Sequence, residues 1–351
     1  MTTTKNYSLK PSTVFVRRRL PRQDISNLTI HSYLSPAKVN LFLRILKKRE
    51  DGYHDIVSVM QPISLYDEII LEMENGSGII VSCDNANVPC DRTNLAYRAA
   101  EEFFRTTGIN KRLSIKIKKN IPIAAGLGGG SSNAATVLRA LNEITSQNIS
   151  TDNLIKIGAG ICSDVPFFIA GKSSIARGRG ELLEPVELPK FWYILVNPGV
   201  PLSTQWVYQT LDKTGGLVKT KPVFSVLSKV KDKISYFVKG QNLNLTKSNE
   251  DINITISKVL AIYRAGRGGN QQVLKGLVMN DLEAVAIKKY PEIKEIKDTL
   301  INSGAICALM SGSGATAFGI FLDEHEAIRA FELLKREQKT RGWAFFLVQG
   351  L

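Results

Sequence analysis

Cysteine and histidine are scarce in this chain of 351 residues, which contains four cysteines and three histidines. The cysteines are widely spaced with no Cys-x-x-Cys pair, and the histidines stand at positions 31, 54 and 325. Structural zinc sites need closely spaced Cys and His ligands, and disulfide frameworks belong to short cysteine-rich chains. The sequence therefore predicts no metal site built by the protein, and we interpret the cysteines as buried thiols of a reducing compartment.

Long apolar runs are also missing, because no stretch approaches the ~20 residues that a membrane-spanning helix needs. Residues 1–28 are rich in Ser, Thr, Lys and Arg, and their first acid is Asp24. They lack the apolar core of a secretory signal. We expect a disordered basic extension on a cytoplasmic protein with no membrane partner. A start of this composition also occurs in organelle transit peptides, which would place the protein in the plastid stroma.

Positive charge is in excess, with 46 Lys and Arg against 32 Asp and Glu and a net charge of +14. Such an excess suits either a nucleic acid or a polyanionic small molecule, because both bring negative charge to be neutralised. No pattern of interleaved basic and aromatic residues typical of RNA-binding domains is present. We therefore expect a polyanionic small molecule as the partner and no specific binding of nucleic acid.

One segment, residues 121–135, reads Ile-Pro-Ile-Ala-Ala-Gly-Leu-Gly-Gly-Gly-Ser-Ser-Asn-Ala-Ala and predicts a phosphate site. Its glycines allow left-handed backbone conformations and let a phosphate approach without a Cβ in the way. Ser131 and Ser132 are expected to cap the following helix, whose amides and dipole favour an anion. Their hydroxyls would also lie near a phosphate oxygen or a phosphate-bound Mg²⁺.

This glycine run differs from the two common nucleotide loops. It lacks the Gly-Lys-Ser/Thr ending of a Walker A loop. Residues 126–131 nearly match the dinucleotide fingerprint, but that fingerprint needs an acid after a second strand, and Glu143 lies in a helical pattern. A plain turn between a strand and a helix remains the alternative, and the Ser-Ser-Asn run makes it less favoured.

Two other segments carry groups suited to phosphoryl transfer, which needs a cation and a group that orients or deprotonates the nucleophile. Lys38 and Asn40 are two residues apart in a strand pattern, so both side chains point to one face. Asp164 lies between a helical stretch and an apolar run. Taken alone, Lys38 suits a surface lysine and Asp164 a helix cap. If they lie close together, the ammonium would keep the carboxylate ionised and able to accept a hydroxyl proton.

Hydrophobic periodicity predicts strands and helices in both halves of the chain. Helices are expected over 95–104 (after Asn94 as a cap), 132–143, 153–159, 280–287, 293–303 and 325–339. Strands are expected over 29–46, within 57–74, and over 113–119, 165–170, 192–196, 305–310, 317–322 and 343–348. The second half has the β-α-β-β-α-β order of a split βαβ sandwich. The predicted domains are 1–28, 29–190 and 191–351, with a basic insert near 213–275.

Three motifs occur in the order found in one enzyme family: Pro-Ala-Lys-Val-Asn-Leu at 36–41, Pro-x-x-x-Gly-Leu-Gly-Gly-Gly-Ser-Ser-Asn-Ala at 122–134, and Ser-Gly-Ser-Gly-Ala-Thr at 311–316. With them the chain resembles the GHMP small-molecule kinases over about residues 33–322. The resemblance is closest to the members that act on a cytidine diphosphate ester of methylerythritol. The segments that single these out include 49–54 (Arg-Glu-Asp-Gly-Tyr-His), 163–168 (Ser-Asp-Val-Pro-Phe-Phe), 176–181 (Ala-Arg-Gly-Arg-Gly-Glu) and 280–283 (Asn-Asp-Leu-Glu).

The resemblance implies a two-domain α+β kinase with the active site in the cleft between its domains. An N-terminal ribosomal-protein-S5-domain-2-like domain would bind ATP with Mg²⁺, and the C-terminal domain would be a ferredoxin-like split βαβ fold. Gly312, Ser313 and Gly314 would brace the phosphate loop. The residues expected to contact ATP are Asn94, Pro122, Ile123, Ala124, Ala125, Gly126, Leu127, Gly128, Gly129, Gly130, Ser131 and Ser132.

The resemblance also implies roles at the reacting groups. Asp164 would deprotonate the 2-hydroxyl of the methylerythritol unit, and Lys38 would polarise that hydroxyl and keep Asp164 ionised. Asn40 would help to hold the substrate, while Tyr53 and His54 would recognise cytosine by stacking and hydrogen bonds. The candidates for a second aromatic ring that closes the base site are Trp206 and Tyr208.

Two alternative functions make different predictions about the residues of the site. The chain could be another GHMP kinase, such as a mevalonate or homoserine kinase. The substrates of those enzymes carry no nucleobase, so they would give Tyr53 and His54 nothing to recognise, which argues against this alternative. A nucleotide-binding module without catalysis would not need Lys38 and Asp164, and both are present. The favoured function is a kinase of the non-mevalonate isoprenoid route, expected as a monomer or weak homodimer.

Overall fold

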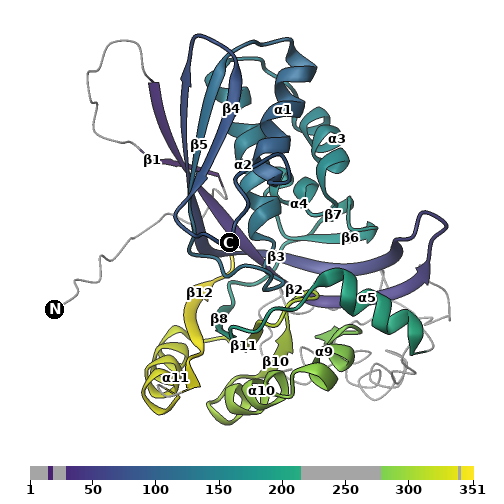
Figure 1. The fold of residues 1–351 in the computed structure, drawn as a ribbon. Coiled ribbons are helices and arrows are strands. Elements are labelled where there is room, and N and C mark those ends of the chain that lie inside the picture. The colour runs from purple at the N-terminus through teal and green to yellow at the C-terminus, as the bar shows by residue number, and fades with distance from the viewer. Residues whose placement is uncertain (1–14, 19–28, 215–277, 339–340) are drawn as a thin grey trace, which may run out of the picture.

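The computed structural model describes residues 15–18, 29–214, 278–338 and 341–351, whose arrangement is shown in Figure 1. Strands and helices occur in both halves, so the predicted α+β class is confirmed. The predicted basic insert near 213–275 lies almost entirely outside the described residues, as does most of the predicted extension 1–28.

The first half is built on one long β-hairpin. β2 (Thr29–Lys48) and β3 (His54–Glu74) pair antiparallel, and Gly52, with a φ of 83°, allows the tight turn between them. β3 is long enough to pair with β6 near its start and with β5 near its end. The remaining strands of this sheet are β1 (Val16–Arg18), β4 (Gly78–Cys83), β5 (Arg112–Lys118), β6 (Ser174–Gly178), β7 (Leu182–Pro185) and β9 (Met279–Asn280).

Helices cover one face of this sheet (Figure 1). Phe103 and Leu138 from the helices pack with Leu71 and Leu113 from the strands in a core from which water is excluded. The predicted helices at 95–104, 132–143 and 153–159 are confirmed, with longer ends. The helices are α1 (Leu95–Thr107), α2 (Gly129–Ile144), α3 (Thr151–Ile161) and α4 (Val165–Ala170).

The last of these corrects a prediction, because Val165–Ala170 is a helix and not a strand. Pro166 lies in its first turn, where the missing N–H of proline is tolerated. Gly171, with a φ of 62°, ends the helix. A six-residue apolar run carries too little periodicity to separate a buried strand from a buried helix, which is why the pattern misled.

Part of the predicted disordered extension, residues 1–28, forms structure. Residues Val16–Arg18 form β1, which pairs antiparallel with β2 at the edge of the sheet. Phe15 stacks on Tyr33 with ring centroids 5.0 Å apart, and Arg17 donates a hydrogen bond to Glu143 at 3.0 Å. A three-residue strand is too short for its alternation to be recognised in a basic, polar segment.

The second half forms an antiparallel sheet in the order β10-β11-β8-β12, which confirms the predicted split βαβ arrangement. One core joins the halves, since Ile63 and Leu127 from the first pack with Leu195 and Phe318 from the second. The elements are β8 (Trp192–Asn197), α5 (Thr204–Lys213), α9 (Glu283–Lys289), α10 (Glu292–Asn302), β10 (Cys307–Met310), β11 (Ala317–Phe321), α11 (Glu324–Glu337) and β12 (Ala344–Gln349).

Candidate active site

The glycine run forms the turn between β5 and α2. Gly126 and Gly128 take left-handed φ values of 75° and 72°, which turn the backbone just before the helix. α2 starts at Gly129, earlier than the predicted 132, and Gly128 occupies the N-cap position without a side-chain cap. The prediction that Ser131 and Ser132 cap this helix is therefore wrong, because both lie inside its first turn.

The start of α2 presents amide groups that its own hydrogen bonds do not use. The bond from Ser132 N to Gly128 O, at 2.9 Å, is the first of the helix. The amides of Gly129, Gly130 and Ser131 come before it and have no acceptor within the helix. At the positive end of a 16-residue helix, these amides can bind an anion.

The rest of the predicted ATP-binding loop is half in the core and half in solvent. Ala125 and Leu127 are buried in the core that joins the two halves. This anchoring holds the loop while its other residues stay accessible. Ile123 and Ala124 are exposed, and Pro122 is half-buried.

The two serine hydroxyls of the loop have different surroundings. Ser132 is fully buried and accepts a hydrogen bond from Ser35 at 2.8 Å. Among the described residues, the one hydrogen-bond partner of the Ser131 hydroxyl is the Cys162 sulfur, at 3.4 Å. Sulfur is a weak acceptor, so Ser131 keeps its capacity to bind a ligand.

The turn at 311–316 packs directly on the glycine loop. Ser311 Oγ donates to Gly126 O at 3.0 Å. A Cβ built on Gly314 would lie 1.9 Å from Ala125 C and Gly126 N, and one on Gly126 would lie 1.9 Å from Ser311 O. The two turns therefore meet backbone against backbone, at a distance that only glycine permits.

Lys38 lies where the three motifs meet, and only 4% of it is exposed. Its backbone N donates to Leu127 O at 3.0 Å, and its Nζ donates to Asn40 Oδ1. A Cβ built on Gly312 would lie 3.2 Å from Lys38 Nζ, and one on Gly128 would lie 3.2 Å from Lys38 Cγ. The alternative of a surface lysine is therefore wrong.

Asp164 faces Lys38 across this site, with Oδ2 at 3.7 Å from the lysine Nζ. It occupies the N-cap position of α4, yet its side chain makes no capping hydrogen bond, so the carboxylate is free for another role. Burial lowers the pKa of Lys38, and the Asp164 carboxylate opposes that shift. Asn40, which accepts from Lys38, is fixed in turn by donating to Ser58 at 2.8 Å.

The predicted base-recognising residues gather at the end of the β2–β3 hairpin. Tyr53 is 55% exposed, while His54 is buried with its ring centroid 5.0 Å from that of Tyr208. Rings this close leave no room for a base between them, so a base would have to stack on Tyr53. Trp206, the other candidate, lies instead under the Lys289 ammonium at 4.1 Å.

Asn94 and Ser313 use their side chains in contacts within the protein. Asn94 caps α1 by accepting from Ala96 N at 2.8 Å, and it donates to Pro89 O at 2.7 Å. Ser313 shares a hydrogen bond of 2.6 Å with Thr204. The predicted N-cap is confirmed, and contact of Asn94 with a nucleotide stays a prediction.

Comparison with known proteins identifies the family. Residues 94–172 match the family model "GHMP kinases N terminal domain", and residues 265–339 match "GHMP kinases C terminal". A 4-diphosphocytidyl-2-C-methyl-D-erythritol kinase of Syntrophotalea carbinolica is 40% identical over 321 residues, which cover 91% of this chain and 99% of that protein. The chain belongs to this family of GHMP kinases. A relative of the same name from Geobacter metallireducens is 40% identical over 84% of this chain and 90% of its own length.

Solved structures agree with this assignment. A crystal structure of 4-(cytidine 5'-diphospho)-2C-methyl-D-erythritol kinase matches with a TM-score of 0.66 and 31% identity, over 91% of this chain and 99% of that one. The L. major mevalonate kinase matches with a TM-score of 0.64 at 16% identity, over 93% and 98% of the two chains, and that likeness shows the fold alone. The predicted two-domain GHMP kinase fold and the prediction of an enzyme of this kinase family are confirmed.

The motifs did not reveal a buried polar cluster around Asp67, next to the glycine loop. Asp67 has no exposed surface, and its Oδ1 accepts from Asn120 N and Ile121 N at 2.9 Å each. Its Oδ2 accepts from Lys119 Nζ and, at 2.9 Å, from Asn133 Nδ2. The carboxylate thus ties the end of β5 and the start of the glycine loop to α2.

Two charged residues near the predicted base-recognising residues were also missed. Arg179 places its guanidinium 5.1 Å from the ring centroid of Tyr53. Asp212 accepts from His54 and from Lys48 at 2.8 and 2.7 Å. Residue spacing carries no signal for either contact, because the partners come from distant parts of the chain.

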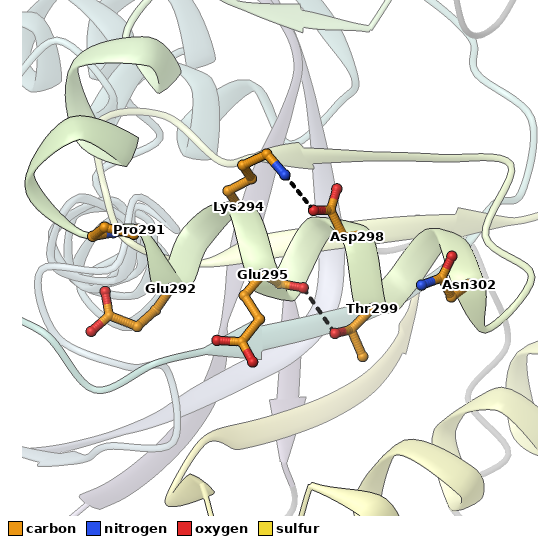
Figure 2. Close-up of a pocket in the computed structure, with 7 residues that line it drawn as sticks. All are labelled: Pro291, Glu292, Lys294, Glu295, Asp298, Thr299 and Asn302. Atoms are coloured by element: carbon orange, nitrogen blue, oxygen red, sulfur yellow. Dashed lines mark hydrogen bonds and ion pairs between the residues drawn. The ribbon is translucent and has the colours of Figure 1, made fainter.

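A hollow of about 450 Å³ lies along α10, away from these groups, and Figure 2 shows its lining. Lys294 donates to Asp298 at 2.6 Å and Thr299 donates to the backbone of Glu295 at 2.8 Å, while the buried Oε2 of Glu292 has no hydrogen-bond partner among the described residues. We assign the hollow no function. In the described part of the chain, no helix combines the length and apolar character needed to cross a bilayer.

Proposed function

We propose that the protein transfers the γ-phosphoryl group of ATP to the 2-hydroxyl of 4-diphosphocytidyl-2-C-methyl-D-erythritol, giving the 2-phosphate and ADP. The step would belong to the non-mevalonate route to isopentenyl diphosphate. The observation that carries the proposal is the meeting of Lys38, Asp164 and the start of α2 at one point. Relatives at 40% identity over most of the chain support the substrate through their names.

In the proposed reaction, the substrate 2-hydroxyl gives its proton to Asp164. Its oxygen forms the new bond to the γ-phosphorus while the bond to the β,γ-bridging oxygen breaks. Lys38 Nζ stabilises the negative charge on the attacking oxygen, and burial makes this attraction stronger than it would be in water. Asn40 keeps the ammonium aimed at that oxygen.

The nucleotide phosphates would lie on the amides at the start of α2. Among the described residues no cluster of three or more His, Cys, Asp or Glu side chains could hold a metal ion. Mg²⁺ bound with ATP would be held mainly by phosphate oxygens and water, and it would neutralise charge on the transferred group. Ser131 suits contact with it better than Ser132, whose hydroxyl is buried and bonded to Ser35.

Purified protein should release ADP from Mg²⁺-ATP rapidly with 4-diphosphocytidyl-2-C-methyl-D-erythritol and negligibly with mevalonate or homoserine. The exposed ring of Tyr53 beside the His54–Tyr208 pair favours a substrate that carries a base. Turnover is measured by coupled ADP detection, with mass spectrometry of the phosphorylated product. Activity on mevalonate or homoserine alone would leave the assignment of the fold valid but refute the proposed substrate.

Gly314→Ala should lower kcat/KM for ATP by about 100-fold, because the new methyl group would push the phosphate loop out of place. Overpacking of this contact should also destabilise the fold by about 1–3 kcal/mol. Gly314 has no left-handed φ, so the test is purely steric. Steady-state kinetics and thermal unfolding measure the two effects.

Gly160→Ala is the matched control, because a Cβ at this α3 position meets nothing within 4 Å. It should leave kinetics unchanged and stabilise the helix slightly. Equal behaviour of the two variants would show that the 311–316 turn does not brace the loop.

A further inference from the structure

His54 contacts the carboxylate of Asp212, which is bound in turn by Lys48, and the proposed chemistry uses neither of these charged side chains. The His54 Nε2 lies 2.8 Å from Asp212 Oδ1, and Lys48 Nζ donates to Asp212 Oδ2 at 2.7 Å. Lys48 pairs with His54 across the β2–β3 hairpin. Tyr208, which packs on the imidazole, and Asp212 lie four residues apart in α5, so one helix face supplies both contacts.

We propose that Asp212, supported by Lys48, is a positioning residue that makes the base site specific for cytosine over uracil. It does so by fixing Nε2 of His54 as a hydrogen-bond donor and leaving Nδ1 as an acceptor. The inference rests on the proposed function, in which His54 reads the base of the substrate.

The chemistry of the imidazole leads to this specificity. A neutral imidazole carries one N–H, and an ionised carboxylate can only accept, so Nε2 must hold the proton. The structure gives Nδ1 no hydrogen-bond partner among the residues it describes. Cytosine presents an amino donor at C4, whereas uracil presents a carbonyl acceptor there. An acceptor at Nδ1 therefore pairs with cytosine and repels uracil.

Lys48 helps to hold the Asp212 carboxylate in this contact with His54. Lys48 Nζ donates to Asp212 Oδ2 while Asp212 Oδ1 lies beside Nε2, so the ammonium compensates the carboxylate charge next to the imidazole. The contact also holds Oδ1 in place as the acceptor for the Nε2 proton. The Lys48 hydrogen bond first, and the His54 contact after it, hold the pKa of the Asp212 carboxyl below its usual range.

Asp212→Asn tests the inference, because an amide can donate to Nε2 and so reverse the imidazole. We expect KM for the cytidine substrate to rise about 10- to 100-fold with kcat nearly unchanged. The ratio of kcat/KM for the cytidine substrate over its uridine analogue should fall by a similar factor. Asp298→Asn, which removes an exposed carboxylate on α10, is the matched control and should change neither value.

Two further measurements, of nucleotide binding and of the His54 imidazole, test the inference without relying on turnover. Binding of CDP and UDP should favour CDP in the wild type and lose that preference in Asp212→Asn. Nitrogen-15 NMR should show His54 protonated at Nε2 in the wild type and at Nδ1 in the variant. If the variant does not fold, Lys48→Met carries the same tests, with a smaller loss of preference.

The outcomes separate the two proposals. An unchanged CDP preference and an unchanged imidazole in Asp212→Asn would overturn the role of Asp212. A wild type that binds CDP selectively but does not phosphorylate the proposed substrate would overturn the proposed function and leave the base specificity standing.

Discussion

Replacing Asp164, the proposed general base, with Asn should lower kcat by about 100- to 10,000-fold, the range expected when a general base is removed. The amide is nearly the same size as the carboxylate but cannot take up the 2-hydroxyl proton. The Asp164 side chain makes no capping bond to α4 and is 31% exposed, so the fold should be little disturbed. Steady-state kinetics with saturating ATP and substrate measure the change.

The pH profile of this variant gives a second readout. The proposed mechanism needs Lys38 as an ammonium, so kcat should fall as pH rises through the lysine pKa. Burial lowers that pKa, and Asp164 opposes the shift in the wild type. Without the carboxylate, the residual rate should therefore begin to fall at lower pH.

The control is Ser163→Ala, a change at the neighbouring position that leaves Lys38 and Asp164 in place. Its kcat should stay within a few-fold of the wild-type value. An Asp164→Asn variant with an equally small loss would show that the proton leaves the substrate by another route.

Periodic elements and family motifs are the parts of this molecule that the sequence could predict. β5 alternates buried and accessible residues along its length, and apolar residues recur at helical spacing in α1 and α2. These elements could therefore be predicted from the hydrophobic pattern. The meeting of Lys38 with Asp164 was predicted through the family resemblance. Spacing alone left a surface lysine and a helix cap as alternatives.

Polar partners from distant parts of the chain could not be predicted. His54 and Asp212 are 158 residues apart, and Lys119 and Asp67 are 52 apart. In β3, Asp67 is fully buried and Glu74 is exposed. The two are seven residues apart and so lie on opposite faces, and Asp67 shares its face with Ile69 and Leu71, which belong to the helix-covered core. Alternation can place Asp67 on the covered face, but it does not show which groups pair with its carboxylate.

Asp67→Ala should destabilise the protein by about 3–5 kcal/mol, the usual result of breaking a buried ion pair on one side. The substitution leaves the buried Lys119 ammonium without its carboxylate, and Asn133 loses an acceptor. It also frees the backbone N–H groups of Asn120 and Ile121 in a site that water reaches poorly. Urea denaturation followed by circular dichroism measures the free energy of unfolding.

Asp298→Ala provides the contrast, because Asp298 pairs with Lys294 at the surface of α10. An exposed pair at this helical spacing contributes at most about 0.5 kcal/mol. Similar losses for the two variants would mean that the Asp67 cluster does not hold the fold together. Since Asn120 and Ile121 lead directly into the glycine loop, the folded fraction of Asp67→Ala should also bind ATP more weakly than Asp298→Ala does. Stability and nucleotide affinity would thus be lost together at a residue that no motif includes.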